Sequence, residues 1–315
     1  MLSVYKSHEE GLRTLSLETL EDGCWVHAVH PTAEEIAEVA KKVGVPEDYF
    51  RFAFEEDGCP RVLRSAGCLL VIVSVPVFRG QDRYDTIPLS AILTSNCTIT
   101  VTRELTSVLP KGGEAGLGFD TTKSVHFFFQ LLYQAGNTFL RQINSIRKRT
   151  DEIEMKLRRS TTNEEVYRLL DLEKGLTYFT AALRANDIVL DNIVRMRASP
   201  QFRRWLPMNE EDEDILESVI IENKRALALV QTYGSILSSM MDAFSSVIAN
   251  NLNHIMKFLA GITILVSIPT MISSFWSMSM VVPLRETEIG FYLVVMLSLL
   301  SSALAGLFLR KKRML

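Results

Sequence analysis

One face of a predicted helix carries the side chains that are best suited to handle ions. Along residues 242–277, small or oxygen-bearing side chains recur at alternating spacings of four and three residues, which places them in one line along a helix. The line consists of Asp242, Ser246, Ala249, Asn253, Met256, Ala260, Thr263, Ser267, Thr270, Ser274 and Ser277. Hydroxyl, amide and carboxyl oxygens of this kind can hydrogen-bond the water around a cation. Ile262, Leu265 and Phe275 lie on other sides of the same helix.

Two interpretations of this polar line compete. Small residues allow two membrane helices to approach closely, so the line could be a packing surface. Copies of the helix around an axis would instead make it the lining of a water-filled pore. Packing accounts well for alanine and serine, but less well for Asp242 and Asn253. The pattern therefore favours a pore, which requires several copies of the chain.

Two groups of carboxylates lie outside the polar line. The first stands at the start of the same predicted helix, at Glu210, Glu211, Asp212, Glu213, Asp214 and Glu217. These side chains could complement the helix dipole in water, or they could form a regulatory patch that binds divalent ions. The second group, Glu286 and Glu288, could concentrate cations near a pore mouth or simply keep a loop hydrated. Both alternatives stay open in each case.

Two long uncharged segments predict a transmembrane hairpin. Residues 258–284 and 289–309 contain no charged side chain. A helix of about 21 residues is roughly 31 Å long, which matches a bilayer core of about 30 Å. Only the outer loop, residues 285–288, joins the two spans, so they must be antiparallel neighbours. Pro269 leaves the carbonyl of Leu265 without its helical donor, which is tolerated where that carbonyl faces protein or pore water.

The charges around the spans predict their orientation. Lys257 precedes the first span and a basic tail, residues 310–315, follows the second. Basic residues stay in the cytoplasm, so both termini are expected on the cytoplasmic side of the cell (inner) membrane. Met1–Ser16 lacks the apolar run of a secretory signal. With 34 basic and 37 acidic residues, the chain has no basic surplus that would favour nucleic acid as a partner.

Residues 1–118 predict a mixed α/β domain. Apolar and β-branched runs predict strands at 24–29, 68–78, 90–93 and 97–102. Thr32 followed by Glu35 is a helix-capping pattern in front of an apolar stripe. The four cysteines, Cys24, Cys59, Cys68 and Cys97, form no C-x-x-C pair and are expected to be free thiols.

Long amphipathic patterns follow this domain. Residues 119–207 predict an antiparallel helical hairpin, with helices from about 122 to 159 and from about 163 to 197. Residues 208–257 predict a stalk helix that continues into the first span, roughly 100 Å in all. A helix of that length needs partners or a membrane along it. No catalytic triad, metal-ligand spacing or phosphate loop stands out, so an enzyme is not expected.

The segment from Met241 to Met280 resembles a known family. Its sequence, MDAFSSVIANNLNHIMKFLAGITILVSIPTMISSFWSMSM, is similar to the end of the long helix and the first span of CorA-type magnesium channels. The similarity is greatest to members that read IPT-x-x-x-SFYGMNV at the outer end of the span. The segments CWVHAVHPTAEEI, EEDGCPRV and TIPLSAIL and the basic KKR tail also have counterparts in that family, so the resemblance covers nearly the whole chain.

The resemblance implies a pentameric funnel. Its parts are an α+β cytoplasmic domain, a long stalk helix that becomes the pore-lining first span, and a second span outside it. Mg²⁺ is then expected both as cargo and as regulator, because divalent ions bound between the cytoplasmic parts hold the family's pore closed. Asp242, Asn253, Met256 and Thr270 fall on positions that line that pore. The implied partners are further copies of the chain in a homopentamer, the lipid bilayer and divalent cations.

The family signature is altered in this chain. Where the family has Gly-Met-Asn, usually after Tyr, the sequence has Trp276, Ser277, Met278 and Ser279. In the family, a ring of Asn oxygens at the pore mouth holds hydrated Mg²⁺. A serine hydroxyl also accepts from bound water, but it is shorter and lacks the amide oxygen. Three functions therefore stay open: a Mg²⁺ channel, a channel for another divalent metal such as zinc, cobalt or nickel, and a non-conducting sensor or regulator.

Overall fold

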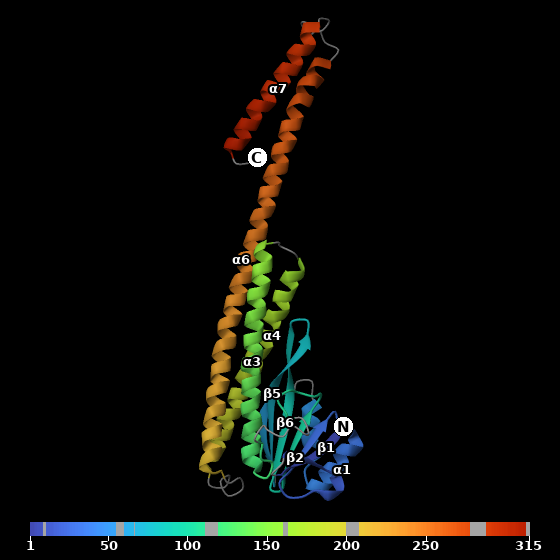
Figure 1. The fold of residues 1–315 in the computed structure, drawn as a ribbon, viewed down its shortest axis with the longest axis vertical. Coiled ribbons are helices and arrows are strands. Elements are labelled where there is room, and N and C mark those ends of the chain that lie inside the picture. The colour runs from blue at the N-terminus through green and yellow to red at the C-terminus, as the bar shows by residue number, and fades with distance from the viewer. Residues whose placement is uncertain are drawn as a thin grey trace. The chain divides into compact units, whose positions relative to one another are not determined.

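The chain forms two compact units, Met1–Ser239 and Met240–Leu315. The computed structural model describes residues 1–8, 11–54, 60–65, 67–110, 119–159, 163–199, 208–277 and 288–312. Figure 1 follows the chain from the N-terminal strands to the last helix.

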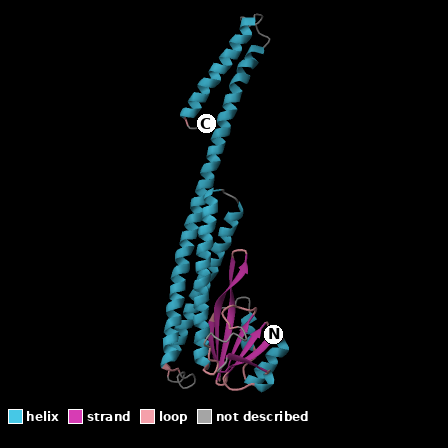
Figure 2. Cartoon of the chain, in the orientation of Figure 1, coloured by secondary structure: helices cyan, strands magenta, loops and turns pink. Residues whose placement is uncertain are grey.

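A mixed β-sheet forms the centre of the first unit (Figure 2). Its strands within the described residues are β1 (Leu2–His8), β2 (Gly11–Leu15), β3 (Cys24–Val29), β4 (Arg61–Ser65), β5 (Cys68–Gly80), β6 (Arg83–Thr94) and β7 (Cys97–Thr102). They lie in the order β2-β1-β3-β7-β6-β5-β4. Neighbours are antiparallel except β3 and β7, which are parallel. The predicted bounds of β3 and β7 are confirmed, whereas the sequence interpretation missed β1, β2 and β4.

Two short helices cover one face of the sheet. Helix α1 (Ala33–Val43) begins with the predicted capping box, in which Thr32 and Glu35 bond each other's backbone N–H groups. It ends at Gly44, whose φ of 75° suits glycine. Helix α2 (Asp48–Arg51) follows α1 and leads directly into the 3₁₀ turn η2 (Phe52–Phe54). Another 3₁₀ turn, η1 (Leu17–Thr19), precedes β3. Their apolar side chains share a core with alternate residues of β3, β5 and β7.

Long helices cover the opposite face. Helices α3 (Ser124–Arg159) and α4 (Asn163–Arg197) pack there with the first turns of α6 (Glu210–Ser277). The aromatic ring of Phe127 lies 5.3 Å from that of Trp25. The side chain of Asn186 bonds both the N–H and the carbonyl of Ser74, each at 2.8 Å, which joins α4 to β5. Asn223 of α6 donates to the carbonyl of Leu183 on α4.

The hairpin of β5 and β6 is longer than the other strands and runs beside α3 and α4 (Figure 1). The sequence interpretation placed only residues 90–93 of β6 in a strand, whereas β6 begins at Arg83 and contains Pro88. Near the tip, the guanidinium of Arg149 lies 2.6 Å from the buried carboxylate of Asp82. Tyr84 packs against Gly175 of α4, where a Cβ would come within 2.7 Å of the Tyr84 Cβ. The hairpin tip is therefore held by both helices.

The second unit is an antiparallel pair of helices, the later part of α6 and α7 (Glu288–Lys311). Both helices are long and apolar enough to cross a membrane. Helix α6 is described as far as Ser277, so the predicted end of the first span at residue 284 lies outside the described residues. Glu288, placed in the outer loop by the sequence interpretation, is the first residue of α7. A carboxylate is favourable at that end of a helix.

Candidate functional site

Helix α7 packs on one side of α6 through a seam of small residues. On α6, the buried and half-buried positions of the span are Gly261, Leu265, Ile268, Pro269, Ile272 and Trp276. On α7, the seam consists of Gly290, Val294, Ser298, Ser302 and Gly306. A Cβ on Gly306 would lie 3.6 Å from the Cδ2 of Leu265. Because small side chains recur every four residues, the two helices can approach closely.

The polar line lies on the other side of α6. Successive residues turn by about 100° around a helix, so Thr263, Ser267 and Ser274 point roughly opposite to Leu265. Every member of the line from Asp242 to Ser277 is exposed in this chain. Helix α7 therefore leaves the polar line uncovered, and it uses a different set of small residues for its own packing.

Several hydroxyl groups of the polar line donate to their own helix. Thr263 bonds the carbonyl of Leu259 at 2.9 Å, Ser267 that of Thr263 at 2.7 Å, and Thr270 that of Val266 at 2.9 Å. A hydroxyl has one donor and two acceptor lone pairs. Once its proton is used by the helix, the oxygen presents acceptors to its surroundings. The line is therefore suited to groups that donate hydrogen bonds, such as the water around a cation.

The polar line continues before the span with larger polar groups. Ser246 donates to the carbonyl of Asp242 at 3.1 Å, so it follows the same pattern. Asp242 forms no salt bridge within the part of the chain that the structure describes. Asn253 and Met256 are exposed, Met256 to 58%. The carboxylate of Asp242 and the amide of Asn253 are thus open to groups from outside their own chain.

Pro269 lies on the side of α6 that faces α7. Both Pro269 and Leu265 are half-buried, and Leu265 is adjacent to Gly306. The carbonyl of Leu265, which Pro269 leaves without a helical donor, could face either protein or pore water. The position of both residues favours protein.

The acidic group at the start of α6 is divided by its contacts. Asp212 is 4% exposed and forms a reciprocal cap with Asn209, and its carboxylate also lies 3.0 Å from Nδ1 of His126 on α3. Glu211 and Glu213 pair with Lys123 and Arg197, at 3.5 and 2.9 Å.

The other three carboxylates, Glu210, Asp214 and Glu217, are exposed. Among the described residues, no three His, Cys, Asp or Glu side chains are grouped as ligands of one metal ion. One copy of the chain thus uses half of the acidic group to hold α6 against its neighbours.

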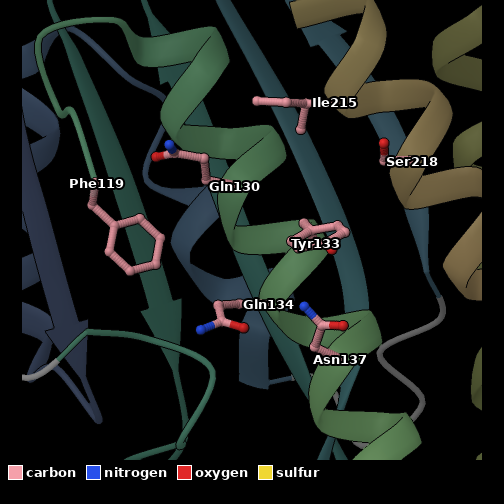
Figure 3. A pocket seen from close by; sticks show the side chains of 7 residues that line it. All are labelled: Phe119, Gln130, Tyr133, Gln134, Asn137, Ile215 and Ser218. Carbon is pink, nitrogen blue, oxygen red and sulfur yellow. The ribbon is translucent and has the colours of Figure 1, made fainter. Parts of the chain in front are cut away.

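A cavity of about 420 Å³ lies between α3 and the first turns of α6 (Figure 3). It is lined by Phe119, Gln130, Tyr133, Gln134, Asn137, Ile215 and Ser218. Its described lining has amide and hydroxyl groups but no carboxylate, the usual anionic ligand of protein-bound Mg²⁺. The cavity is therefore a weaker candidate for an ion site than the polar line.

Comparison with known proteins identifies the family. Residues 21–311 match the family model described as CorA-like Mg²⁺ transporter protein. The chain belongs to this family. It is accordingly a membrane protein with two C-terminal transmembrane helices, a divalent cation transporter and not an enzyme.

Individual relatives agree with this CorA-like assignment. The cobalt/magnesium transport protein CorA of Methanocaldococcus jannaschii is 25% identical over 287 residues, which cover 87% of this chain and 85% of the relative. The complete structure of the CorA magnesium transporter from that organism has a TM-score of 0.76 at 21% identity, covering 99% of this chain and 96% of that one. The full-length CmaX protein gives 0.70 at 19% identity, with the same coverage. At these identities the structural likeness shows the CorA fold.

The altered CorA signature is only partly described. Trp276 is half-buried on the side of α6 that faces α7, and Ser277 is exposed on the polar line. Met278, Ser279 and Glu286 lie outside the described residues. The structure thus separates Trp276 from the polar line, and the predicted role of the four signature residues in selectivity stays a prediction.

Sequence reasoning missed two features of this CorA-like chain. The small-residue seam of α7 was not recognised, although Gly290, Ser298, Ser302 and Gly306 are spaced by multiples of four. His126 was missed as the partner of Asp212, because it lies 86 residues away and no local pattern connects them.

Proposed function

We propose that five copies of this chain surround an axis and conduct Mg²⁺ through a pore lined by the polar line of α6. The observation that carries this proposal is the exposure of the line on the side of α6 opposite the α7 seam. In such an assembly α7 lies outside, between α6 and lipid, and the hydroxyl groups face water. Five copies supply the partners that one copy lacks.

The chemistry of the line fits a hydrated cation. Mg²⁺ loses its water reluctantly, so a pore for it must accept hydrogen bonds from bound water. Thr263, Ser267 and Thr270 use their protons on the helix, and rings of their oxygens would face the ion. Asp242 would add negative charge at the start of the line, which favours cations over anions.

Regulation and orientation complete the proposal. Lys257 and the basic tail favour a cytoplasmic location for both termini, in the cell (inner) membrane. Divalent ions bound to the first unit would hold the pore closed. Glu210, Asp214 and Glu217 remain the best sensing candidates of the acidic group, since they are exposed while Asp212 is engaged with Asn209 and His126.

Cobalt is the second candidate cargo, since a relative is named as a cobalt/magnesium transport protein. The polar line contains no His or Cys, the ligands that hold softer metals more firmly than Mg²⁺, so Mg²⁺ is favoured. A non-conducting regulator is the third candidate, suggested by the changed signature.

The test is ion uptake into liposomes containing the purified full-length protein, with a Mg²⁺ dye inside. Wild type is compared with the double variant Ser277→Gly/Ser279→Asn, and Co²⁺ is added as a competitor. Uptake of Mg²⁺ by wild type supports the proposal. If only the double variant takes up Mg²⁺, the natural role of this pore is something other than Mg²⁺ entry. If neither protein takes up Mg²⁺ or Co²⁺, the function as a non-conducting regulator is favoured.

A further inference from the structure

A row of small polar side chains crosses one end of the sheet in the first unit. Cys24 begins β3, Cys97 begins β7, and these two residues are direct partners in the parallel pair. Thr94 ends β6 and contacts Cys97 through its hydroxyl, and Cys68 of β5 is the partner of Thr94. The three cysteines are buried in the same core, with exposures of 1, 3 and 2% for Cys24, Cys97 and Cys68.

The pairing of Cys24 with Cys97 places their thiols on the same face of two neighbouring strands. Both are free thiols in this structure. Neighbouring strands are about 4.8 Å apart, which is within the Cα separation of about 4.4–6.8 Å found for disulfides. Strand β6 lies between Cys68 and Cys97, so their separation is about twice as large and exceeds this range.

The pair lies next to exposed chain. Ser95 and Asn96 are exposed and directly precede Cys97, and Gly23 donates a backbone bond of 2.6 Å to the carbonyl of Asn96. Ends of strands open more readily than their centres. Opening of this turn would give a small oxidant access to the two thiols while the rest of the sheet stays folded.

We propose that Cys24 and Cys97 form a redox-modification site, at which a hydroperoxide converts the two thiols into an intramolecular disulfide that small thiols reduce again. A disulfide between directly paired strand residues has Cβ atoms slightly too far apart for the best geometry, so it is strained. Strained disulfides are the more easily reduced ones, as a reversible modification requires.

The two cysteines have different roles in this oxidation. The hydrogen bond from Cys24 lowers the pKa of the Cys97 thiol, with a further contribution from Thr94, whereas its bond to Cys97 and its burial raise the pKa of Cys24. Cys97 also directly follows the exposed Asn96, whereas Cys24 follows the half-buried Gly23, so an oxidant that enters at this turn meets Cys97 first. Cys97 is therefore the attacking thiolate. Its sulfur attacks the terminal oxygen of the peroxide, the O–O bond breaks, and a sulfenic acid forms; the leaving group is an alkoxide from an organic hydroperoxide and hydroxide from hydrogen peroxide. The sulfur of Cys24 then displaces the hydroxyl group of the sulfenic acid, which leaves as water with the proton of Cys24.

The test treats purified full-length protein with hydrogen peroxide. The remaining thiols are alkylated, the unreduced protein is digested, and linked peptides are identified by mass spectrometry. We expect a Cys24–Cys97 link as the main cross-link, and we expect dithiothreitol to remove it. In the Cys24→Ser variant we expect dimedone to trap a sulfenic acid at Cys97.

Cys68 is the matched control, because it is equally buried in the same core but has no thiol opposite it. The Cys68→Ser variant should form the Cys24–Cys97 link as wild type does. The proposal is overturned if Cys24 and Cys97 stay alkylatable after treatment that oxidises Cys68. Links of either residue mainly to Cys59 or Cys68 would also overturn it.

Discussion

The two units of this chain treat their polar side chains differently. In Met1–Ser239, several polar groups find partners in the same copy: Asn186 bonds Ser74 of β5, and Asp212 bonds Asn209 and lies against His126. Others there, such as the hydroxyls of Ser90, Thr98 and Thr102, are buried without a hydrogen-bond partner among the described residues. In Met240–Leu315, the hydroxyls of Thr263, Ser267 and Thr270 bond carbonyls of their own helix, and these three residues are exposed.

The difference concerns where the partners of these groups are found. A buried polar group without a partner costs free energy, so the bonds of Asn186 and Asp212 stabilise the first unit from within one copy. The polar line instead lies exposed on an apolar helix that belongs in a membrane, where water is available only in a pore. In the proposed pore, its partners are water, ions and other copies of the chain. The predictions below test this contrast, beginning with the largest effect.

The largest effect is expected from a bulky side chain on the polar line. Leucine in place of Ser274 would put an apolar ring of side chains into the proposed pore, and we expect Mg²⁺ uptake to fall by more than about tenfold, a barrier of about 1.4 kcal/mol or more. The measurement is dye-reported uptake in liposomes.

Ser273→Leu is the matched control, because Ser273 is also exposed but is turned about 100° away from the line. We expect it to keep most of the uptake. Equal loss in both variants would contradict the assignment of the polar line as the pore lining.

The next largest effect concerns a buried histidine of the first unit. Burial lowers the pKa of His27 to about 4, from its ordinary value of 6.5, and its ring stacks on Trp25. The unfolded chain therefore takes up a proton near pH 6.5, whereas the folded chain does so only near pH 4. Stability present above pH 6.5 is lost as the pH falls to 4, by about 3 kcal/mol at most.

Urea unfolding between pH 7 and pH 4 measures this loss. His27→Gln should flatten the dependence on pH, whereas His30→Asn, a change at an exposed position, should retain it. An unchanged slope in His27→Gln would show that other groups cause the acid sensitivity.

A third prediction concerns two helical glycines. Gly175→Ala would place a Cβ 2.7 Å from that of Tyr84 and push α4 away from the β5–β6 hairpin. We therefore expect the free energy of unfolding to fall by about 1–3 kcal/mol. A Cβ on Gly234 would meet no described atom within 4 Å, and Gly234→Ala should stabilise α6 by about 0.5–1 kcal/mol. Chemical unfolding monitored by circular dichroism gives both values. Effects of the same sign would contradict this packing.

The smallest effect is expected at the start of α6. Asp212→Asn removes a negative charge from the N-terminus of α6 and weakens the contact with His126. We therefore expect the free energy of unfolding to fall by about 1–2 kcal/mol. Glu210→Gln, at an exposed position of the same turn, should change stability by less than about 0.5 kcal/mol. If Asp212→Asn kept full stability but changed the inhibition of uptake by internal Mg²⁺, Asp212 would be a sensor and not a structural cap.

Local patterns carried most of what could be predicted from the sequence. The capping box of Thr32 and Glu35 needs only four consecutive residues, and it is present in the structure. The polar line and the two apolar helices likewise follow from spacing and composition. The parallel pairing of β3 with β7 depends on segments far apart in the chain, which no local pattern encodes.

The candidate site shows the same limit. Spacing identified which residues of α6 share a face, but the side on which α7 packs depends on the fit of two surfaces. Asp212 looked equivalent to its acidic neighbours, because its burial depends on His126 in another helix. What the sequence could not supply was the packing side of α7 in the first case and a partner far along the chain in the second.

The seam between α6 and α7 has one further consequence. Its positions on α7 repeat every four residues, from Gly290 through Val294, Ser298 and Ser302 to Gly306, so a slip of four residues, about 6 Å, would place one seam position where the next had been. Ser298 and Ser302 would exchange like for like, whereas the larger Val294 would take the place of a glycine or a serine and oppose the slip. Arg310 and Lys311 at the end of α7 also oppose a slip in one direction, because it would draw their charges into the hydrocarbon.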